Sequence, residues 1–414
     1  MFKVPIFKVP VVLLATLFAT LVSTQAGAVP TPNPPPGLVD EAFASWLTIF
    51  RQEAIAAGVS GSVFDQAMRG VRPDPQVVTS NDNQPEFVRP VWDYLASAIS
   101  DTRVANGQAM LQTHARLLGQ LEERYGVDRE VVVAIWGLET GYGAFMGTHK
   151  VTRALATLAY SGRRMKFGRE QLLAALKILQ RGDIEPQAMT GSWAGAMGHT
   201  QFIPTTYNAH AVDFDGDGKR DIWNNIGDAL GSTGNYLGQA GWLTDAPWGA
   251  EVVLPAEFNY ALADKSIQKP LAYWAALGVR LHGGGAVDAG ARDVLASLIL
   301  PAGHKGPAFL IRKNFRTVLR YNNSTSYSLA VNLLADRFRG QGHIRAAWPT
   351  DDRPLGRTER EELQRLLTAK GHDTQGFDGI IGGNTRKALR AWQLTQGLPA
   401  DGYPTAALLG WLRR

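Results

Sequence analysis

Glu139 is the carboxylate in this sequence whose surroundings best suit acid catalysis. It follows an almost wholly apolar segment, VVVAIWGL (131–138), and precedes the glycine-rich turn TGYG (140–143). Apolar surroundings and the negative end of a helix both disfavour an ionised carboxylate, so they raise its pKa and suit a general acid. The two glycines leave room for a bulky substrate beside the backbone. The alternative is a glutamate that ends a helix and points into water.

A second informative stretch is SWAGAMGHTQFIP (192–204), in which small residues alternate with aromatic ones. This composition is typical of a polar cleft against tightly packed backbone. Ser192 and Gln201 carry groups that can form hydrogen bonds with sugar hydroxyls or amides. His199 has no paired carboxylate or nucleophile in this stretch, so a structural role is favoured for it.

The segment DFDGDGKRD (213–221) matches the calcium-loop template, in which alternating carboxylates precede a glycine. The template predicts oxygen ligands from the carboxylates of Asp213, Asp215 and Asp217 and the backbone carbonyl of Lys219. The loop position usually occupied by a bidentate glutamate is Asn224, so the next carboxylate, Asp228, becomes a displaced last ligand. An acidic turn without a metal is the alternative.

Composition excludes several classes of function. The 414 residues are 45% hydrophobic, which is enough for a core, and contain no cysteine. Disulfide scaffolds, thiolate metal sites, cysteine nucleophiles and lipid attachment to an N-terminal cysteine are therefore excluded. The net charge of +5 suits polyanionic surroundings such as a cell wall. A nucleic-acid partner is disfavoured because no basic cluster is interleaved with aromatic residues.

The first 28 residues are typical of a signal peptide. Lys3 and Lys8 form a positive start, residues 9–22 are apolar and uncharged, and AGA (26–28) is a small-x-small cleavage pattern. We expect export to the periplasm with cleavage near Ala28 and no stable membrane anchor. An uncleaved anchor is the alternative. Residues 29–37 form a proline-rich spacer.

Hydrophobic periodicity predicts a mainly α-helical body with a minor β component. A buried helix is expected over 129–139, with Asp128 as its N-cap, and another helix over 169–180. Strand-like runs occur at 251–254 and 308–311. Proline and charge interrupt the periodicity over 346–357. Two further helices are then expected, over 358–370 and 385–396.

The ordered motifs resemble those of lytic murein transglycosylases of the membrane-bound B type, over roughly residues 38–350. The resemblance is carried by ETGYG (139–143), SWAGAMGHTQFIPTTY (192–207), DFDGDG (213–218) and Asn235-Tyr236. It implies a lysozyme-like α-helical catalytic domain that cleaves the MurNAc–GlcNAc β-1,4 bond of peptidoglycan. Cleavage is non-hydrolytic, leaves 1,6-anhydro-MurNAc ends and serves cell-wall remodelling or turnover.

The resemblance also implies roles for individual residues. Glu139 becomes the single catalytic acid and base, and calcium becomes a structural ion, with no organic cofactor. The residues implied to bind substrate are Ser192, Gln201, Tyr236, Tyr321, Tyr327, Arg163 and Arg164. The chain departs from lipoprotein members of the family because it lacks the lipid-bearing cysteine, so membrane attachment does not carry over. Its calcium loop also departs, with Lys219 at the carbonyl position and an extra residue before Asp228.

Residues 355–414 resemble the three-helix peptidoglycan-binding module. The resemblance rests on the ordered pairs Leu363-Gln364, Asp378-Gly379, Trp392-Gln393 and Asp401-Gly402. A generic helical domain is the alternative. The expected partners are peptidoglycan glycan strands, with other cell-wall enzymes as a further class.

Two other functions remain open at this point. A lysozyme-like muramidase would hydrolyse the same bond with water, but it needs a second carboxylate, and the motifs around Glu139 show none. A non-catalytic peptidoglycan-binding protein would leave Glu139 without a role, although the intact acid in its apolar segment argues against this.

Overall fold

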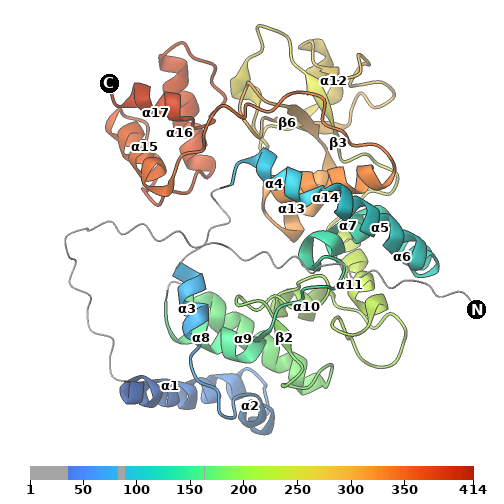
Figure 1. Ribbon diagram of the computed structural model, residues 1–414, viewed down its shortest axis with the longest axis vertical. Helices are drawn as coiled ribbons and strands as arrows, with labels where there is room; N and C mark the ends of the chain where they lie inside the picture. Colours follow the sequence, from blue (N-terminus) through green and yellow to red (C-terminus); the bar gives the residue numbers. More distant parts are fainter. Residues whose placement is uncertain (1–35, 83–88, 163) are drawn as a thin grey trace, which may run out of the picture. The chain divides into compact units, whose positions relative to one another are not determined.

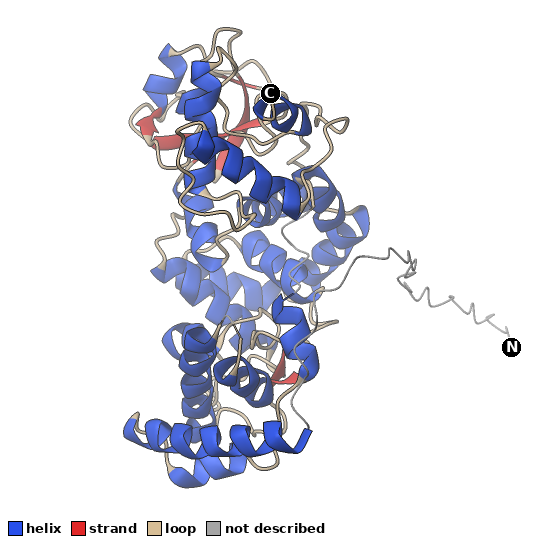
Figure 2. Ribbon diagram, turned by 90° about the vertical axis from the view of Figure 1, so that its left-hand side faces the viewer, coloured by secondary structure: helices blue, strands red, loops and turns tan. Residues whose placement is uncertain are grey.

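Helices make up most of the described chain, residues 36–82, 89–162 and 164–414, in the computed structural model (Figure 2). The predicted fold class, mainly α with a minor β component, is confirmed. Residues 43–414 form one compact unit. Among the described residues, no helix is both long and apolar enough to cross a membrane.

Seventeen α-helices follow one another along the described chain (Figure 1). Those before the acidic loop are α1 (Pro36–Ala56), α2 (Gly61–Ala67), α3 (Pro75–Asp82), α4 (Val91–Ala98), α5 (Asp101–Thr113), α6 (Ala115–Tyr125), α7 (Arg129–Thr140), α8 (Val151–Tyr160), α9 (Met165–Arg181) and α10 (Pro204–His210). Those after it are α11 (Ile226–Gln239), α12 (Leu271–Ala276), α13 (Lys313–Tyr321), α14 (Thr325–Phe338), α15 (Arg357–Ala369), α16 (Gly383–Thr395) and α17 (Ala406–Leu412). The strands are β1 (His149–Lys150), β2 (Thr190–Gly191), β3 (Gly249–Val253), β4 (Lys269–Pro270), β5 (Arg280–Leu281), β6 (Leu295–Ile299) and β7 (Ala308–Ile311).

The apolar segment before Glu139 forms α7, as its composition predicts, and residues 131–137 of this helix are all buried. A helix that is apolar on every side needs neighbours on every side. Helices α5, α6, α11 and α14 pack against it, and Figure 1 shows α14 and α5 beside it. Gly141 ends the helix in the left-handed conformation, with φ of 59°, which a side chain would disfavour.

Asp128 occupies the N-cap position of α7, but its side chain makes no capping hydrogen bond. Its carboxylate instead accepts hydrogen bonds from Arg339 at 2.8 Å and from the indole of Trp242 at 3.2 Å. The backbone N–H of Arg129 donates to Glu122 at 3.2 Å. Asp128 therefore occupies the predicted N-cap position but does not cap the helix, because Arg339 and Trp242 bind its carboxylate.

A five-stranded sheet lies between α11 and α13 in the sequence, with strand order β4-β6-β7-β3-β5 and antiparallel pairs throughout. In its centre, Leu310 of β7 faces Ala250 of β3 on one side and Leu298 of β6 on the other. The strand-like runs at 251–254 and 308–311 correspond to β3 and β7. The sequence did not predict β6, because four of its five residues are buried and it lacks the alternation that marks a half-exposed strand.

The last three helices, α15, α16 and α17, share a core of their own. Two equivalent clamps join the helices to their loops. In the first, Gln364 accepts from the N–H of Gly379 at 2.8 Å and donates to Asp378 at 3.0 Å. In the second, Gln393 accepts from the N–H of Gly402 at 2.8 Å and donates to Asp401 at 2.8 Å. The Gln and Asp-Gly pairs seen in the sequence thus form a structural repeat.

Among the described residues, only the second clamp forms hydrogen bonds with a residue outside the C-terminal module. Asp401 accepts from the backbone N–H of His304 at 2.9 Å and lies 2.7 Å from its ring Nδ1. Burial by itself raises the pKa of Asp401, but hydrogen bonds from His304, Tyr403 and Gln393 outweigh it and hold that pKa below its usual range. Arg390 adds an ion pair with Asp264. These contacts fasten the three helices to the region of the sheet.

We expect Asp401→Ala to lower the free energy of unfolding by about 3 kcal/mol, because it leaves several buried donors without an acceptor. The matched control is Asp378→Ala in the first clamp, where the exposed carboxylate should cost about 1 kcal/mol. Urea unfolding of the two variants measures both values. If the two variants lost equal free energy of unfolding, Asp401 would not be the residue that attaches the three helices to the region of the sheet.

Candidate active site

Glu139 lies in the last turn of α7, where its side chain is partly exposed. The hydroxyl of Tyr327 donates a hydrogen bond of 2.6 Å to its Oε1. Burial raises the pKa of Glu139 to about 7, and the hydrogen bond from Tyr327 acts in the opposite direction. The predicted rise in pKa is present, and it comes from desolvation.

Tyr327 is held in place by the start of α14. Its backbone N–H donates to the side chain of Ser324, the N-cap residue, at 3.3 Å. The side chain is 5% exposed. Burial and the nearby charge of Glu139 keep the pKa of Tyr327 well above its usual range, so the hydroxyl remains a donor at any pH near neutrality.

The charge of Glu139 acts on two more phenols, Tyr321 and Tyr94. Burial raises the pKa of Tyr321 well above its usual range, and the charge of Glu139 adds to the rise. The same two causes, in the same order, raise the pKa of Tyr94 to about 12. Tyr94 belongs to α4 and was not predicted as a site residue. It carries no sequence motif, and only the packing of α4 on α14 brings it to the site.

Tyr236 and Tyr321 form an aromatic group beside these phenols. Their rings meet edge to face at 5.2 Å between centroids, and Phe202 packs against both. The hydroxyl of Tyr236 donates to the carbonyl of Arg320 at 2.6 Å, and that of Tyr321 donates to the carbonyl of Thr200. Both tyrosines are therefore oriented by backbone acceptors, with their rings partly exposed.

Ser192 and Gln201 hold the backbone of their own segment. The hydroxyl of Ser192 accepts from the N–H of Ala196 at 3.1 Å. Gln201 has a positive φ of 52°, and its amide nitrogen donates to the carbonyls of Met146 at 3.1 Å and Gly198 at 2.9 Å. Since Met146 follows Glu139 by a few residues, Gln201 ties this segment to the loop that leaves α7.

His199 has a structural position, as favoured from the sequence. Its ring Nδ1 accepts from the indole N–H of Trp136 at 3.1 Å, and its carbonyl accepts from the hydroxyl of Thr140 at 2.7 Å. Burial lowers the pKa of His199, so the ring stays a neutral acceptor. A Cβ on Gly143 would come within 2.5 Å of the His199 ring, which explains the glycine there.

The structure places Arg164 against aromatic rings. Its guanidinium lies 5.1 Å from the ring centroid of Phe167 and 6.0 Å from that of Trp193. Because Trp193 follows Ser192, the guanidinium of Arg164 lies against the predicted cleft segment, residues 192–204. Arg163, the other member of the predicted basic pair, lies outside the described residues.

The acidic loop brings three of its predicted ligands together. One carboxylate oxygen from each of Asp213, Asp215 and Asp217 lies within 4.8 Å of the others. The carboxylate of Asp213 also accepts from the N–H groups of Gly216 at 2.7 Å and Gly218 at 2.8 Å. A compact set of oxygen donors is the chemistry that calcium requires, so these residues fit that ion.

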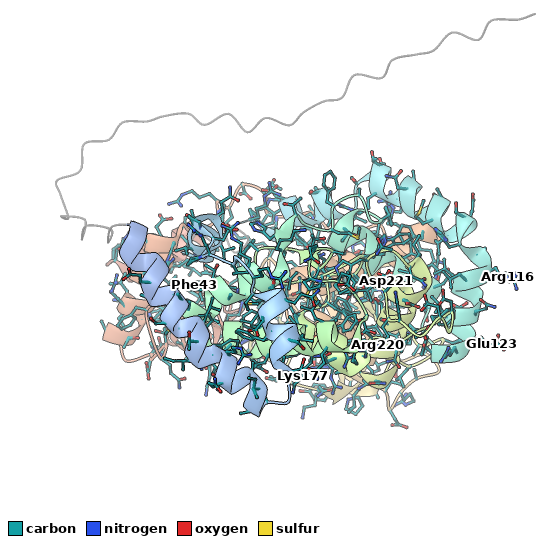
Figure 3. All side chains as sticks on the ribbon, turned by 90° about the horizontal axis from the view of Figure 1, so that it is seen from below. Phe43, Arg116, Glu123, Lys177, Arg220 and Asp221 are labelled. Carbon is teal, nitrogen blue, oxygen red and sulfur yellow. The ribbon has the colours of Figure 1, made fainter. Side chains whose placement is uncertain are left out.

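Two further predicted ligands have other contacts. The N–H of Lys219 donates to Asp217 at 2.8 Å. Asp228 lies outside the three-carboxylate cluster and is fully buried, and its two oxygens accept from the N–H groups of Phe214 and Asp221, each at 2.7 Å. Burial raises the pKa of Asp228 to about 6. Arg220 and Asp221, labelled in Figure 3, end this acidic segment.

Within the described chain, no second carboxylate hydrogen-bonds to Glu139 or changes its pKa. The site therefore consists of one acid of nearly neutral pKa, surrounded by phenols. Such a site can donate a proton and take one back, but it offers no carboxylate nucleophile.

Two families of known domains match the chain. Residues 42–336 match the Transglycosylase SLT domain, and residues 356–412 match a peptidoglycan binding domain. The membrane-bound lytic murein transglycosylase B of Escherichia coli (strain K12) is 31% identical over 272 residues, which cover 62% of this chain and 70% of that relative.

Solved structures show the same fold. SltB3 from Pseudomonas aeruginosa, in complex with NAG-anhNAM-pentapeptide, is 59% identical with a TM-score of 0.88, over 90% of this chain and 99% of that one. The Escherichia coli lytic transglycosylase Slt35, in complex with calcium, is 28% identical with a TM-score of 0.62, over 71% of this chain and 92% of that one. The lysozyme-like fold expected from the sequence is thereby confirmed.

The carboxyl group of Glu139, the ordered motifs around it and these relatives agree. The chain belongs to the family of lytic transglycosylases, enzymes that act on peptidoglycan.

Proposed function

We propose that Glu139 alone serves as acid and base when this enzyme cleaves the MurNAc–GlcNAc β-1,4 bond. The observation that carries the proposal is one carboxyl group with a pKa of about 7 and no carboxylate partner in the described chain. With this pKa, a sizeable fraction of Glu139 is protonated at neutral pH and can give up its proton, and the carboxylate that this leaves can then take a proton back.

In the first step, protonated Glu139 gives its proton to the glycosidic oxygen, and the bond from that oxygen to the anomeric carbon of MurNAc breaks. The acetamido group of the same sugar supports the positive anomeric carbon. This internal group takes the place of the second carboxylate that an ordinary glycosidase supplies.

In the second step, the 6-hydroxyl of MurNAc attacks the anomeric carbon and ionised Glu139 takes the hydroxyl proton. The products are a 1,6-anhydro-MurNAc end and a free GlcNAc end, and Glu139 is protonated again. No water is consumed.

Tyr327 positions Glu139 for both steps. Its hydroxyl binds Oε1, while Oε2 has no hydrogen-bond partner in the described chain and can face the substrate. The hydrogen bond stabilises the carboxylate and so limits how far burial raises its pKa. A lower pKa makes Glu139 a stronger proton donor in the first step, and that donation itself produces the carboxylate that acts as the base in the second step.

We assign the remaining predicted residues to the substrate cleft. Their groups either reach sugar hydroxyls and amides or stack on sugar rings. They are Ser192, Gln201, Tyr236, Tyr321, Tyr327, Arg163 and Arg164. Tyr94 joins them because the charge of Glu139 acts on it.

The same proposal extends to the organisation of the chain. Residues 38–350 form the catalytic domain, and residues 355–414 form the peptidoglycan-binding module. Residues 1–28 direct export to the periplasm, and residues 29–37 act as a spacer. The partners that follow are glycan strands and, as a further class, other cell-wall enzymes.

Calcium has a structural role in this proposal. Asp213, Asp215 and Asp217 supply carboxylates, with the carbonyl of Lys219 as a further oxygen. A ligand role for Asp228 stays a prediction. In the structure, that buried carboxylate closes the loop onto α11 through backbone N–H groups.

We expect Glu139→Gln to lower turnover of peptidoglycan by about 10²- to 10⁴-fold, because the amide keeps the shape but transfers no proton. Mass spectrometry of digested sacculi measures both the rate and the 1,6-anhydro product. Glu123→Gln, on the exposed side of α6 (Figure 3), is the control and should digest normally. Hydrated reducing ends in the wild-type digest would indicate a muramidase instead.

Glu139 should also make stability depend on pH. Its folded-state pKa of about 7 exceeds the ordinary 4.5, so between these values the folded protein binds more protons than the unfolded one. Stability therefore falls as pH rises from 4.5 to 7 and stays lower above that range. Glu139→Gln should be more stable than wild type by about 1–3 kcal/mol at pH 8 and similar at pH 5. Urea unfolding at both pH values tests this, and a constant difference would contradict it.

Millimolar calcium should raise the melting temperature of the wild type by mass action. Asp217→Asn should remove this rise, since it replaces one of the clustered carboxylates on an exposed part of the loop. Turnover per folded molecule should stay unchanged. An unshifted melt together with no heat in a calorimetric calcium titration would show that the loop is an acidic turn.

A further inference from the structure

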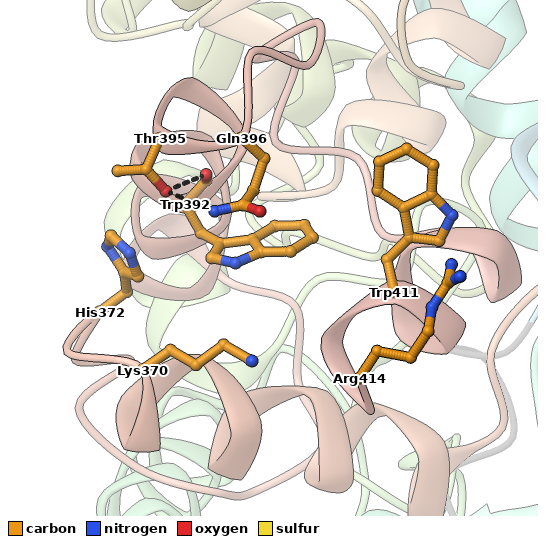
Figure 4. Close-up of a pocket in the computed structure, with 7 residues that line it drawn as sticks. All are labelled: Lys370, His372, Trp392, Thr395, Gln396, Trp411 and Arg414. Atoms are coloured by element: carbon orange, nitrogen blue, oxygen red, sulfur yellow. Dashed lines mark hydrogen bonds between the residues drawn. The ribbon is translucent and has the colours of Figure 1, made fainter.

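We propose that a pocket in the C-terminal module binds the carboxylate end of a peptidoglycan stem peptide. The inference rests on the proposed wall-binding role of residues 355–414 and adds a site and a ligand class to it. The pocket, of about 670 Å³, is shown in Figure 4. The residues that line it include Lys370, His372, Trp392, Trp411 and Arg414.

The charge of this pocket favours an anion. No carboxylate side chain lines it, and neither Lys370 nor Arg414 forms an ion pair with an Asp or Glu side chain in the described chain. The neighbouring Arg413, in contrast, is neutralised by two hydrogen bonds of 2.8 Å to Glu362. Cations that lack a protein partner can bind a ligand carboxylate directly.

Aromatic groups give the pocket an apolar surface beside these cations. Trp411 is 48% exposed, and the guanidinium of Arg414 lies 5.7 Å from its ring centroid. Trp392 is buried, and Figure 4 shows its ring between Lys370 and Trp411. Its indole N–H has no acceptor among the described residues, so it remains available as a donor. An exposed tryptophan next to free donors is typical of binding hot spots.

The pocket is preformed. Trp392 packs in the module core with Leu363 and Leu389. The hydroxyl of Thr395 donates to the carbonyl of Trp392 at 2.7 Å, drawn in Figure 4, and the ion pair of Arg413 with Glu362 anchors the end of α17. A rigid pocket loses little entropy when a ligand binds.

These groups select a short chain that ends in a carboxylate and carries small apolar side chains. Stem peptides have this chemistry, because their alanine methyl groups can lie on Trp411 while the terminal carboxylate meets Lys370. While the stem peptides are attached, the lactyl carboxyl groups of the glycan are amides, so the glycan itself offers hydroxyls and amide groups, which do not require two cations. The volume is within the usual range for pockets that hold small ligands.

Co-sedimentation of the full chain with sacculi tests the proposal. All variants carry Glu139→Gln, so that the wall stays intact during the measurement. Trp411→Ala and Lys370→Glu should each raise the apparent Kd about tenfold or more. The matched controls are Phe377→Ala and Arg365→Glu, an exposed aromatic–cation pair 5.8 Å apart on the same module but outside the pocket. They should change the Kd less than about twofold.

Competition with a soluble stem peptide on intact sacculi identifies the ligand. At saturation, the free peptide should weaken binding of the parent to the level of the pocket variants, whereas the same peptide with its terminal carboxylate converted to an amide should leave the difference unchanged. Pocket-dependent binding that survives the free peptide would overturn the proposal in favour of the glycan. So would pocket variants that bind intact sacculi as tightly as the parent. If the parent itself does not sediment with intact sacculi, the proposed wall-binding role fails at the outset.

Discussion

The hydrogen bond from Tyr327 to Glu139 is the contact on which the rest of the site depends. The proposed catalysis by one carboxyl group needs a pKa close to the working pH, and two opposing effects set the pKa of Glu139 at about 7. Burial at the end of an apolar helix raises the pKa, and one phenol donor limits the rise. Because the donor sits on α14 and the acid on α7, the packing of these two helices sets the chemistry. The fold therefore has to bury α7 on all sides while leaving one carboxylate oxygen accessible.

Residues between α7 and α10 form hydrogen bonds that hold the end of α7, the helix that carries Glu139. Trp136 and Thr140 bind the ring and the carbonyl of His199, and Gln201 binds the carbonyl of Met146. These bonds join the turn after Glu139 to a segment more than fifty residues later. Such bracing restricts the position of the carboxyl group, which a proton transfer within hydrogen-bond distance requires. A Cβ on Gly147 would lie 2.2 Å from the carbonyl oxygen of Gly191, which shows how closely the two backbones approach.

Features that depend on local sequence were predictable, and those that depend on packing were not. Glu139 was found because its helix, its desolvation and its turn are contiguous, and the acidic loop was found for the same reason. Tyr94 was missed because a single tyrosine on a short helix carries no signal until α4 packs on α14. The missed strand β6 and the bonding of Asp128 have the same cause, since long-range partners override the local pattern. Roles for Tyr236, Tyr321 and Tyr327 came only from the family resemblance, and the structure adds which acceptor orients each hydroxyl.

Electrostatics explains why cations that bind the anionic cell wall should not lie in direct contact with the acid. A cation next to Glu139 would stabilise its carboxylate and lower the pKa, which would deplete the protonated form at neutral pH. In the described chain, no lysine or arginine contributes to the pKa of Glu139, and its surroundings are phenols and apolar groups. The proposed pocket puts its unpaired cations in a separate module, where attraction to carboxylates cannot disturb the acid. Dividing the work between two sites lets each keep the charge that its own chemistry requires.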